Sequence, residues 1–180
     1  MRIPLLAGAL MLLASGCSAD RDTRVFRVPS SSMEPTLHCA RPQQGCEGAA
    51  IDRVAVHPYG SATPRRGDIV VFRTPARARA VCGAAGLFIK RVVALPHERW
   101  AERAGTILID GRPLAEPYVS AGRRDSQSFR GGPIPNGRYL LLGDNRSASC
   151  DSRVWGLVPR ENLVGAVFEV KRGSKLIHIR

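Results

Sequence analysis

The sequence predicts a mainly β protein, and three observations point to this class. Its 180 residues include 18 Gly and 13 Pro, a content typical of chains with many turns. Its apolar runs are mostly short, as in strands, and they lack the period of long amphipathic helices. The length suffices to bury one substantial core, so we expect one compact domain with at most a small subdomain.

Four segments are predicted as core strands because each is rich in β-branched or large apolar residues. In chain order they are residues 69–72, 88–93, 139–142 and 164–170. Within 107–114 an Asp-Gly pair follows a short apolar run and predicts a β-hairpin. The remaining long stretches, 39–66 and 122–137, contain Gly and Pro, and we expect an excursion in the first and polar turns in the second.

The chain is strongly basic, with 27 Lys and Arg against 15 Asp and Glu and a formal net charge of +12. Such a charge suits nucleic acid or an anionic membrane surface. Aromatic residues make up only 6%, the arginines are scattered in pairs such as 65–66 and 123–124, and no zinc-finger, helix-turn-helix or RNA-binding signature occurs. We therefore expect no nucleic-acid partner.

The N-terminus carries a membrane-targeting pattern, because an uncharged and mostly apolar segment runs from Ile3 to Ala19. A spanning helix needs about 20 apolar residues, so this segment is at the short limit for an anchor and long enough for a signal peptide. Its end, Leu-Ala-Ser-Gly-Cys at 13–17, resembles a lipoprotein box, although the Leu lies four places before Cys17 rather than three. We favour an uncleaved anchor over a lipidated Cys17, and both place the body outside the cytoplasm.

Apart from Cys17, the chain has four cysteines, and an even number outside the cytoplasm favours disulfides. Of the three possible pairings we prefer Cys39 with Cys46, which closes a short loop, and Cys82 with Cys150, which requires two distant segments to meet. A structural zinc site is the rival interpretation, but no Cys-x-x-Cys pair and no group of histidines supports it.

Two stretches contain residues suited to nucleophilic catalysis. Residues 30–37 place three serines before Met33, and 88–93 place Lys90 among apolar neighbours. A serine nucleophile needs a base to take its proton. Burial among apolar side chains can lower a lysine pKa from about 10.4 toward 7 to 8, where the amine works as a general base. Taken alone, the first stretch reads equally as a turn and the second as a strand with solvated basic side chains.

Two further stretches of the chain contain recognisable motifs. Residues 66–72 join an Arg-Gly-Asp turn to a strand, and 143–159 begin with Gly-Asp-Asn-Arg and include Cys-Asp-Ser-Arg. With 30–37 and 88–93, and behind an apolar N-terminus, they closely resemble type I signal peptidases, the S26 family of bacterial leader peptidases. The resemblance spans 29–159 and implies a signal-peptidase-like (LexA-like) fold of coiled antiparallel β-sheets, with a small inserted cap and an N-terminal membrane segment.

The resemblance implies roles for four polar residues. Ser32 matches the family's nucleophile, and Lys90 matches its general base. Ser30 matches the side-chain donor to the oxyanion, which acts together with the backbone N–H of Ser32. Ser149 matches a serine whose hydroxyl orients the lysine.

Five charged residues match structural positions of the family. We expect Asp144 to pair with Arg91 and Asp151 with Arg153, so that the pairs brace the strand of the lysine, and we assign Arg146 the same structural character. The alternative is that the charges within 143–153 are solvated side chains of an ordinary turn.

The implied activity is that of a membrane-bound serine endopeptidase that removes signal peptides from exported preproteins. Pro29 and Met33 are expected to line the pocket for the substrate, which has small residues at the first and third positions before the scissile bond. An extended substrate can add to a strand edge. The resemblance implies no cofactor and no metal. We expect a monomer at the cytoplasmic membrane, in contact with lipid, with its catalytic domain on the extracytoplasmic side.

This organisation divides the chain into an anchor or lipoprotein-type signal at 1–19, a catalytic β-domain at 20–97 and 139–180, and an inserted cap at 98–138. Two other functions stay open. A LexA-type Ser/Lys self-cleaving protein would need a DNA-binding N-terminal domain, where this chain has an apolar segment. A secreted lipoprotein could serve as a binding module that retains the fold without catalysis, although Ser32 and Lys90 are both present.

Overall fold

The computed structural model describes residues 22–179, so the predicted N-terminal segment 1–19 lies outside the described residues. Within this range the protein is mainly β, as predicted, with twelve strands and a few short helices. Between residues 22 and 179, no helix combines the length and the apolar character needed to cross a membrane.

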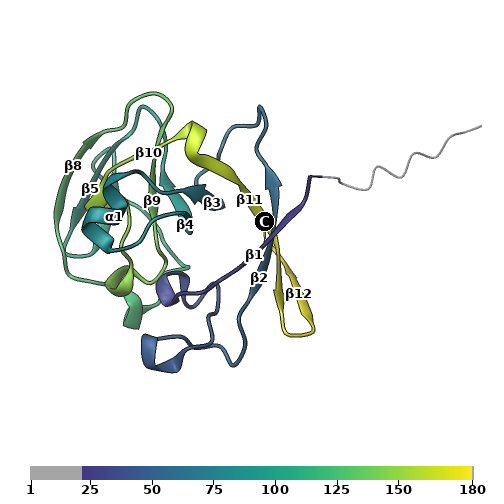
Figure 1. Cartoon of the computed structure of the whole chain (residues 1–180). Coiled ribbons are helices and arrows are strands. Elements are labelled where there is room, and N and C mark those ends of the chain that lie inside the picture. The colour runs from purple at the N-terminus through teal and green to yellow at the C-terminus, as the bar shows by residue number, and fades with distance from the viewer. Residues whose placement is uncertain (1–21, 180) are drawn as a thin grey trace, which may run out of the picture.

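Eight strands form the larger sheet, in the order β1-β2-β11-β3-β4-β9-β10, with β12 paired to β11 (Figure 1). Every pairing in this sheet is antiparallel. The strands are β1 (Arg24–Arg27), β2 (Arg53–Pro58), β3 (Ile69–Arg73), β4 (Leu87–Ala94), β9 (Arg138–Leu142), β10 (Val158–Pro159), β11 (Leu163–Arg172) and β12 (Lys175–His178). The four strands predicted from apolar runs are confirmed as β3, β4, β9 and β11.

The region 39–66 is not purely an excursion, which corrects the prediction. It contains β2, which lies between β1 and β11 in the larger sheet. Along β2 the side chains of Val54 and Val56 are buried, while Arg53 and Pro58 are exposed. Such alternation indicates a strand with one buried face, and it is present in the sequence at 53–58.

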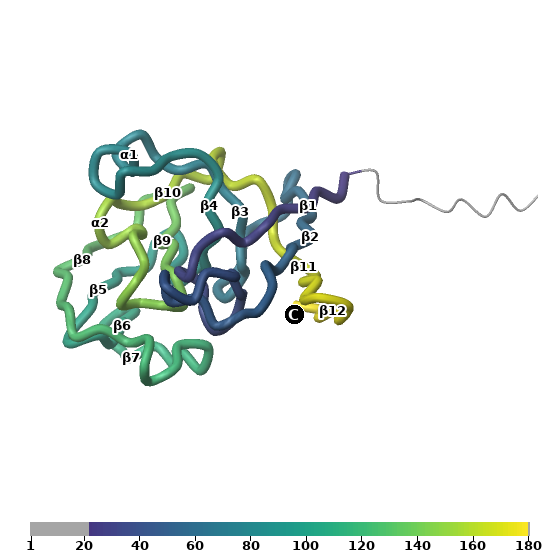
Figure 2. The backbone as a smooth tube through the Cα atoms, turned by 60° about the horizontal axis from the view of Figure 1, so that its bottom comes forward, coloured from purple at the N-terminus to yellow at the C-terminus, as the bar shows by residue number. Residues whose placement is uncertain are grey.

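A second, four-stranded antiparallel sheet has the order β7-β6-β5-β8 and lies at the opposite end of the molecule from β12 (Figure 2). Its strands are β5 (Arg99–Arg103), β6 (Thr106–Ile109), β7 (Arg112–Pro113) and β8 (Phe129–Pro133). All four fall within 98–138, the segment that we call the cap. The predicted hairpin is confirmed as β6 and β7, and its turn places both Asp110 and Gly111 at positive φ. Strand β8 was missed, because 122–137 was expected to contain only turns.

The helices are short, and two of them, Arg146–Ala148 and Ser152–Trp155, lie in the segment that follows β9. They are α1 (Arg77–Cys82), α2 (Ser152–Trp155) and the 3-10 helices η1 (Ser31–Met33), η2 (Pro42–Gln44), η3 (Ala121–Arg123), η4 (Arg146–Ala148) and η5 (Arg160–Asn162). Both preferred disulfides are confirmed. The Cys82–Cys150 bridge joins the end of α1 to the loop after β9, and the Cys39–Cys46 bridge closes a loop around η2.

Strand β3 is buried on both faces, which explains its unbroken apolar run. Val70 and Phe72 belong to a core cluster that also contains Trp155, whereas Ile69 and Val71 belong to a cluster that contains Met33. Successive side chains of a strand point to opposite faces, so β3 separates the two clusters. A third cluster packs the cap against β4 and β9, through residues such as Ile107, Ile134 and Leu140.

Candidate active site

The segment of Ser32 is fixed from both sides. Met33 is fully buried in the core beside it, and the Ser31 Oγ donates to the carbonyl of Gln44 at 2.7 Å. Asn145 donates its side-chain amide to the carbonyl of Ser31 at 3.0 Å and its backbone N–H to the carbonyl of Ser32 at 3.2 Å. These contacts hold the serine hydroxyl in one position against the strand β4.

Lys90 lies in the middle of β4 and meets this serine. Its Nζ donates to the Ser32 Oγ at 2.6 Å, although 57 residues lie between them in the sequence. The residue is only 2% exposed. Burial lowers the pKa of Lys90 to about 8, while the carboxylates of Asp151 and Asp144 act in the opposite direction. A substantial share of neutral amine is therefore available near neutral pH.

Ser30 stands at the position expected of a second hydroxyl. Its Oγ lies 3.3 Å from the Ser32 Oγ, within hydrogen-bond distance, and it is exposed toward the cavity described below. The backbone before η1 is extended at Ser30, which directs the two hydroxyls toward each other. Its role toward an oxyanion stays a prediction.

Ser149 lies close to the nucleophile but makes no bond to Lys90. Among the described residues its buried Oγ has no hydrogen-bond partner, because the Lys90 Nζ points to Ser32 instead. The Cα of Gly143 lies so close that an added Cβ would collide with both the Ser149 Oγ and the Ser32 carbonyl. Only glycine permits this approach, so Gly143 belongs to the site, although the sequence analysis gave this first residue of the Gly-Asp-Asn-Arg motif no role of its own.

The expected pair of Arg91 and Asp144 is present and bidentate. Arg91 donates from Nε to Oδ1 at 2.9 Å and from Nη2 to Oδ2 at 2.7 Å. The Thr36 hydroxyl donates to the same carboxylate at 2.6 Å, and Arg91 also donates to the carbonyl of Gly67 at 2.8 Å. Asp144 is fully buried, so the alternative of a solvated turn charge is wrong here. The carboxylate ties the segment of Ser32 to the strand of Lys90.

The expected pair of Asp151 and Arg153 is also present, with Nε donating to Oδ1 at 2.9 Å. Asp151 caps the N-terminus of α2 and accepts from the backbone N–H of Gly143 at 3.2 Å. Arg153 reaches further, because it also pairs with Asp125 and Glu102 of the cap. The loop after β9 is thereby attached to the inserted segment.

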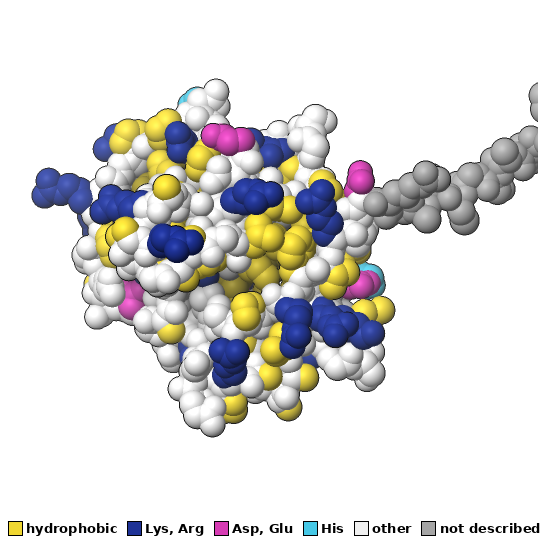
Figure 3. All heavy atoms as spheres, in the orientation of Figure 1, with side chains coloured by type: hydrophobic (Ala, Val, Ile, Leu, Met, Phe, Trp, Pro, Cys, Tyr) yellow, Lys and Arg dark blue, Asp and Glu magenta, His cyan; other side chains and the backbone are white. Residues whose placement is uncertain are grey.

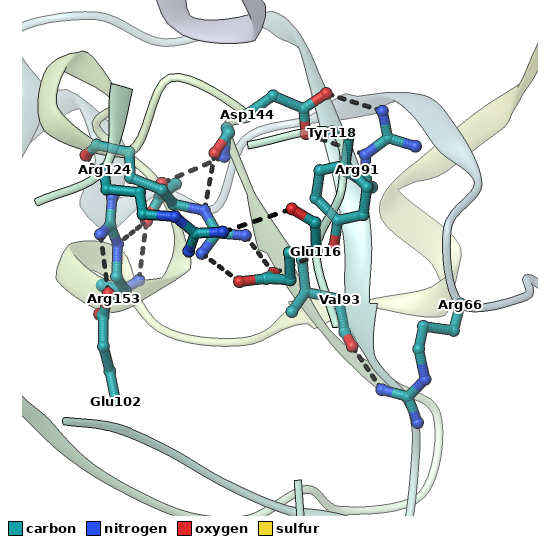
Figure 4. Close-up of polar contacts among 12 residues, drawn as sticks. Arg66, Arg91, Val93, Glu102, Glu116, Tyr118, Arg124, Asp144 and Arg153 are labelled. Atoms are coloured by element: carbon teal, nitrogen blue, oxygen red, sulfur yellow. Dashed lines mark hydrogen bonds and ion pairs between the residues drawn. The ribbon is translucent and has the colours of Figure 1, made fainter. Parts of the chain in front are cut away.

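A third buried pair was not predicted. Arg146 donates from Nη1 to the Glu116 Oε2 at 2.9 Å and from Nη2 to Oε1, and both side chains are 1% exposed. The Tyr118 hydroxyl donates to Glu116, and its ring lies 4.0 Å from the Arg91 guanidinium. In Figure 4 the Glu116 carboxylate and the Tyr118 ring lie between Arg91 and Arg153. No sequence signal distinguishes Glu116 from an exposed loop residue.

A cavity of about 530 Å³ opens beside Ser32 and Lys90. Pro29 and Met33 both contribute to its lining, as expected of pocket residues. The other walls include Phe88 and Ile89 of β4 and Val71 of β3. Figure 3 shows apolar side chains gathered in a hollow on this face, with Lys and Arg side chains above and below it. The geometry suits a nucleophile at the edge of an apolar groove.

Comparison with known proteins decides the family. The family model described as signal peptidase, peptidase S26, matches residues 4–170. The chain belongs to this family. A signal peptidase I of Leptolyngbya laminosa is 38% identical over 141 residues, which cover 77% of this chain and 63% of the relative. Synechocystis has a "Probable signal peptidase I-2" that is 38% identical over 143 residues, with 78% of this chain and 59% of the relative covered.

The chain thus spans about three fifths of the length of these two S26 relatives. A "Probable signal peptidase I-1" of Synechocystis is covered more fully, with 35% identity over 91% of this chain and 77% of the relative. A crystal structure of a signal peptidase I from Enterococcus faecalis matches with a TM-score of 0.48 and 28% identity, over 58% of this chain and 96% of that chain.

One cluster in this family member brings possible metal ligands together, outside the pair of Ser32 and Lys90. The donor atoms of Glu34, His38 and Glu47 lie within 4.8 Å of one another. The fully buried Glu34 carboxylate already accepts from the backbone N–H groups of Cys39 and Glu47 and contacts the His38 Nδ1. The Glu34 carboxylate therefore stabilises the disulfide-closed loop that follows η1.

Proposed function

We propose that the protein is a serine endopeptidase that removes signal peptides from exported preproteins, with Ser32 as nucleophile and Lys90 as general base. The observation that carries the proposal is the 2.6 Å contact between the Lys90 Nζ and the Ser32 Oγ in a buried setting. Burial keeps part of the amine neutral near pH 7, and only the neutral amine can accept the hydroxyl proton. Membership of the S26 family supports the same reaction.

In the first half of the reaction, neutral Lys90 takes the proton of the Ser32 hydroxyl as the oxygen attacks the peptide carbonyl. Negative charge then develops on the carbonyl oxygen, where the backbone N–H of Ser32 and the hydroxyl of Ser30 can donate to it. The lysine ammonium returns its proton to the leaving amine, and the peptide bond breaks. The signal peptide stays bound as an ester of Ser32.

In the second half, water replaces the leaving chain. Lys90 takes a proton from the water as it attacks the ester, and the protonated lysine then returns the proton to the Ser32 oxygen. We assign Ser149 the orientation of the lysine, since its buried Oγ lies beside the nucleophile segment and has no hydrogen-bond partner among the described residues. Both halves need the same two residues, so no further base is required.

The apolar cavity supports an extended substrate with small side chains. Its lining by Pro29, Met33 and Val71 suits aliphatic side chains. An added strand can pair with the edge strand β1, or with the part of β4 before Arg91, which β9 does not pair. We propose that residues 1–19 hold this site at the extracytoplasmic face of the membrane, as a single-pass segment or through lipid on Cys17. We propose further that the protein works as a monomer, without a cofactor.

The test compares cleavage of a preprotein by the wild-type protein in detergent with cleavage by Ser32→Ala and Lys90→Ala. We expect each variant to lose at least about 100-fold in kcat/KM, since each removes a group that both halves require. Lys175→Ala is the matched control, because this lysine is exposed on β12. Cleavage at the wild-type rate by either Ser32→Ala or Lys90→Ala would refute the dyad.

A further inference from the structure

The charged side chains that line the cavity beside Ser32 are all cationic. They are Arg27, Arg41 and Lys90, and no Asp or Glu of the described residues joins them in the lining. Lys90 is occupied by its bond to Ser32. Arg27 and Arg41 are exposed, and neither side chain has a hydrogen bond or an ion pair with another described residue. The cavity therefore presents two unpaired guanidinium groups to whatever chain enters it.

Arg41 stands on a loop that is held in place from several directions. The Cys39–Cys46 disulfide closes this loop, and the buried Glu34 carboxylate accepts from its backbone at Cys39. At its far side, the Ser31 Oγ donates to the carbonyl of Gln44 at 2.7 Å. Because Ser31 precedes the nucleophile, the loop keeps a fixed relation to the reacting hydroxyl. Such a support fixes the backbone of Arg41, so only its side chain has to be ordered when it meets a charged partner.

The cap contributes one more attachment. Arg123 of η3 donates to the carbonyl of Gly45 at 3.2 Å and pairs with Glu47 at 2.6 Å. The loop thus bridges the nucleophile segment and the cap, and Arg41 lies at its cavity side. The Arg41 guanidinium thus lines the cavity without a carboxylate partner among the described residues.

The lining of the cavity combines apolar and polar side chains, and each kind suits a different part of the substrate. The apolar walls at Met33, Val71 and Phe88 suit the small side chains that precede the cleaved bond. These walls take the residues before the bond, so a charged partner for Arg41, which shares the lining with Gln44, belongs to the chain that follows the bond. Opposite charges attract across a solvated cleft, and like charges repel by similar amounts.

We propose that Arg41 is a specificity-determining residue that favours an acidic side chain among the first three residues after the cleaved bond. The proposal rests on the proposed function, since it names a preference of the same site. It concerns the mature part of the preprotein, not the signal peptide.

The test uses one preprotein with Asp, Asn or Lys placed in turn at each of the three positions after the cleavage site. For the wild-type protein at low salt, kcat/KM should be about fivefold higher with Asp than with Lys at the preferred position, as expected of a solvated ion pair. Arg41→Ala should remove this preference, and Arg41→Glu should reverse it. High salt should reduce the difference in the wild type.

Arg112→Glu is the matched control, because Arg112 is an exposed arginine on β7 outside the cavity lining, and it should keep the wild-type order. An unchanged order in Arg41→Glu, or a reversal produced by Arg27→Glu instead, would overturn the assignment to Arg41. The Asn substrate separates this result from the proposed function. If the wild type cleaves it and Ser32→Ala does not, the proposed function stands whatever the order; if the wild type cleaves none of the substrates, both proposals fail.

Discussion

Two opposed effects set the pKa of Lys90. Its burial disfavours the ammonium, whereas the carboxylates of Asp151 and Asp144 favour it. The balance puts its pKa at about 8, so about one tenth of the molecules carry the neutral amine at pH 7. A fully solvated lysine would be neutral in about one of 2,500 molecules at that pH. The strand position of Lys90 thus supplies most of its capacity as a base.

The pH dependence of cleavage follows from this value. We expect kcat/KM to rise about tenfold per pH unit below pH 8 and to level off above it, because only the neutral amine can take the Ser32 proton. Steady-state cleavage of a preprotein between pH 6 and 9.5 measures the profile. A rate that is constant from pH 6 to 9 would contradict the role of Lys90.

Stability should change in the same pH range, and the sign is fixed by linkage. The folded pKa of Lys90 is below the unfolded value, so the unfolded chain binds more protons between pH 8 and about 10.5. The contribution of Lys90 to the free energy of unfolding therefore rises through that window and is least favourable below pH 8. Urea unfolding of the wild type and of Lys90→Met isolates this contribution, since the methionine variant lacks it.

The contact between Ser32 and Lys90 and the two charge pairs could be predicted because local sequence patterns carry these residues. Ser32, Lys90 and the partners of Arg91 and Arg153 all stand in short motifs. Glu116 was not predictable, because its partner Arg146 lies 30 residues away and nothing near it in the sequence marks it as buried. The role of Ser149 toward Lys90 stays a prediction, since its Oγ has no hydrogen-bond partner among the described residues and its position depends on the close approach of Gly143, which only the fold produces.

At the scale of elements, the loop after β9 connects the two sheets of the molecule. It carries Asp144 toward β4, and it carries Arg146 and Arg153 toward the cap. Its arginines are almost fully buried, so each needs its carboxylate partner. The cap therefore has a mechanical connection to the loop beside Ser149, in addition to its apolar contact with β4 and β9.

Removal of one carboxylate tests this connection. Glu116→Gln leaves the buried Arg146 without a charge partner, and we expect the free energy of unfolding to fall by about 3 to 5 kcal/mol, measured by urea unfolding. Glu47→Gln is the matched control, because its partner Arg123 is paired at a more exposed site and the loss should stay below about 1 kcal/mol.

A second variant separates the charge from the packing. Glu116→Leu combined with Arg146→Met removes both members of the pair, so it should recover much of the stability lost in Glu116→Gln. Equal stability of Glu116→Gln and the wild type would show that Arg146 finds another partner, which would contradict the connection described here.

Strands were predicted correctly where a local sequence pattern is enough to form them. Strands β3, β4, β9 and β11 carry continuous or alternating apolar residues, and the Asp-Gly turn marks the β6–β7 hairpin. Strand β8 contains two glycines and a proline, which are rare in strands, so its side chains do not predict it. Its strand conformation depends on pairing with β5. Helix α1 is basic and short, so its helix propensity alone does not predict it. The Cys82–Cys150 bridge attaches it to a segment that is distant in the sequence.

At the scale of the whole molecule, the two disulfides close loops of very different size. Cys82 and Cys150 are 68 positions apart, and Cys39 and Cys46 are 7 apart. The longer link restricts the unfolded chain more, because it excludes more of its conformations. It also joins α1 to the loop of Asp144 beside the apolar core, so it connects parts that the sequence separates.

The two bridges should therefore contribute unequally to stability. Replacement of Cys82 and Cys150 by Ser should lower the free energy of unfolding by about 4 kcal/mol, and replacement of Cys39 and Cys46 by about 2 kcal/mol. Urea unfolding of the two double variants under the same conditions measures the difference. A larger loss from the shorter loop would show that local contacts, and not chain entropy, dominate.

Strand β11 lies between β2 and β3 in the larger sheet, although it is one of the last elements of the sequence. The nucleophile segment follows β1, on one side of β11, and Lys90 lies in β4, on the other. During synthesis a ribosome releases the first half of the sheet long before residues 163–172, so the two halves have no common strand until the end. The strand that joins the side of Ser32 to the side of Lys90 is thus made last, so the larger sheet cannot be complete before residues 163–172 are available.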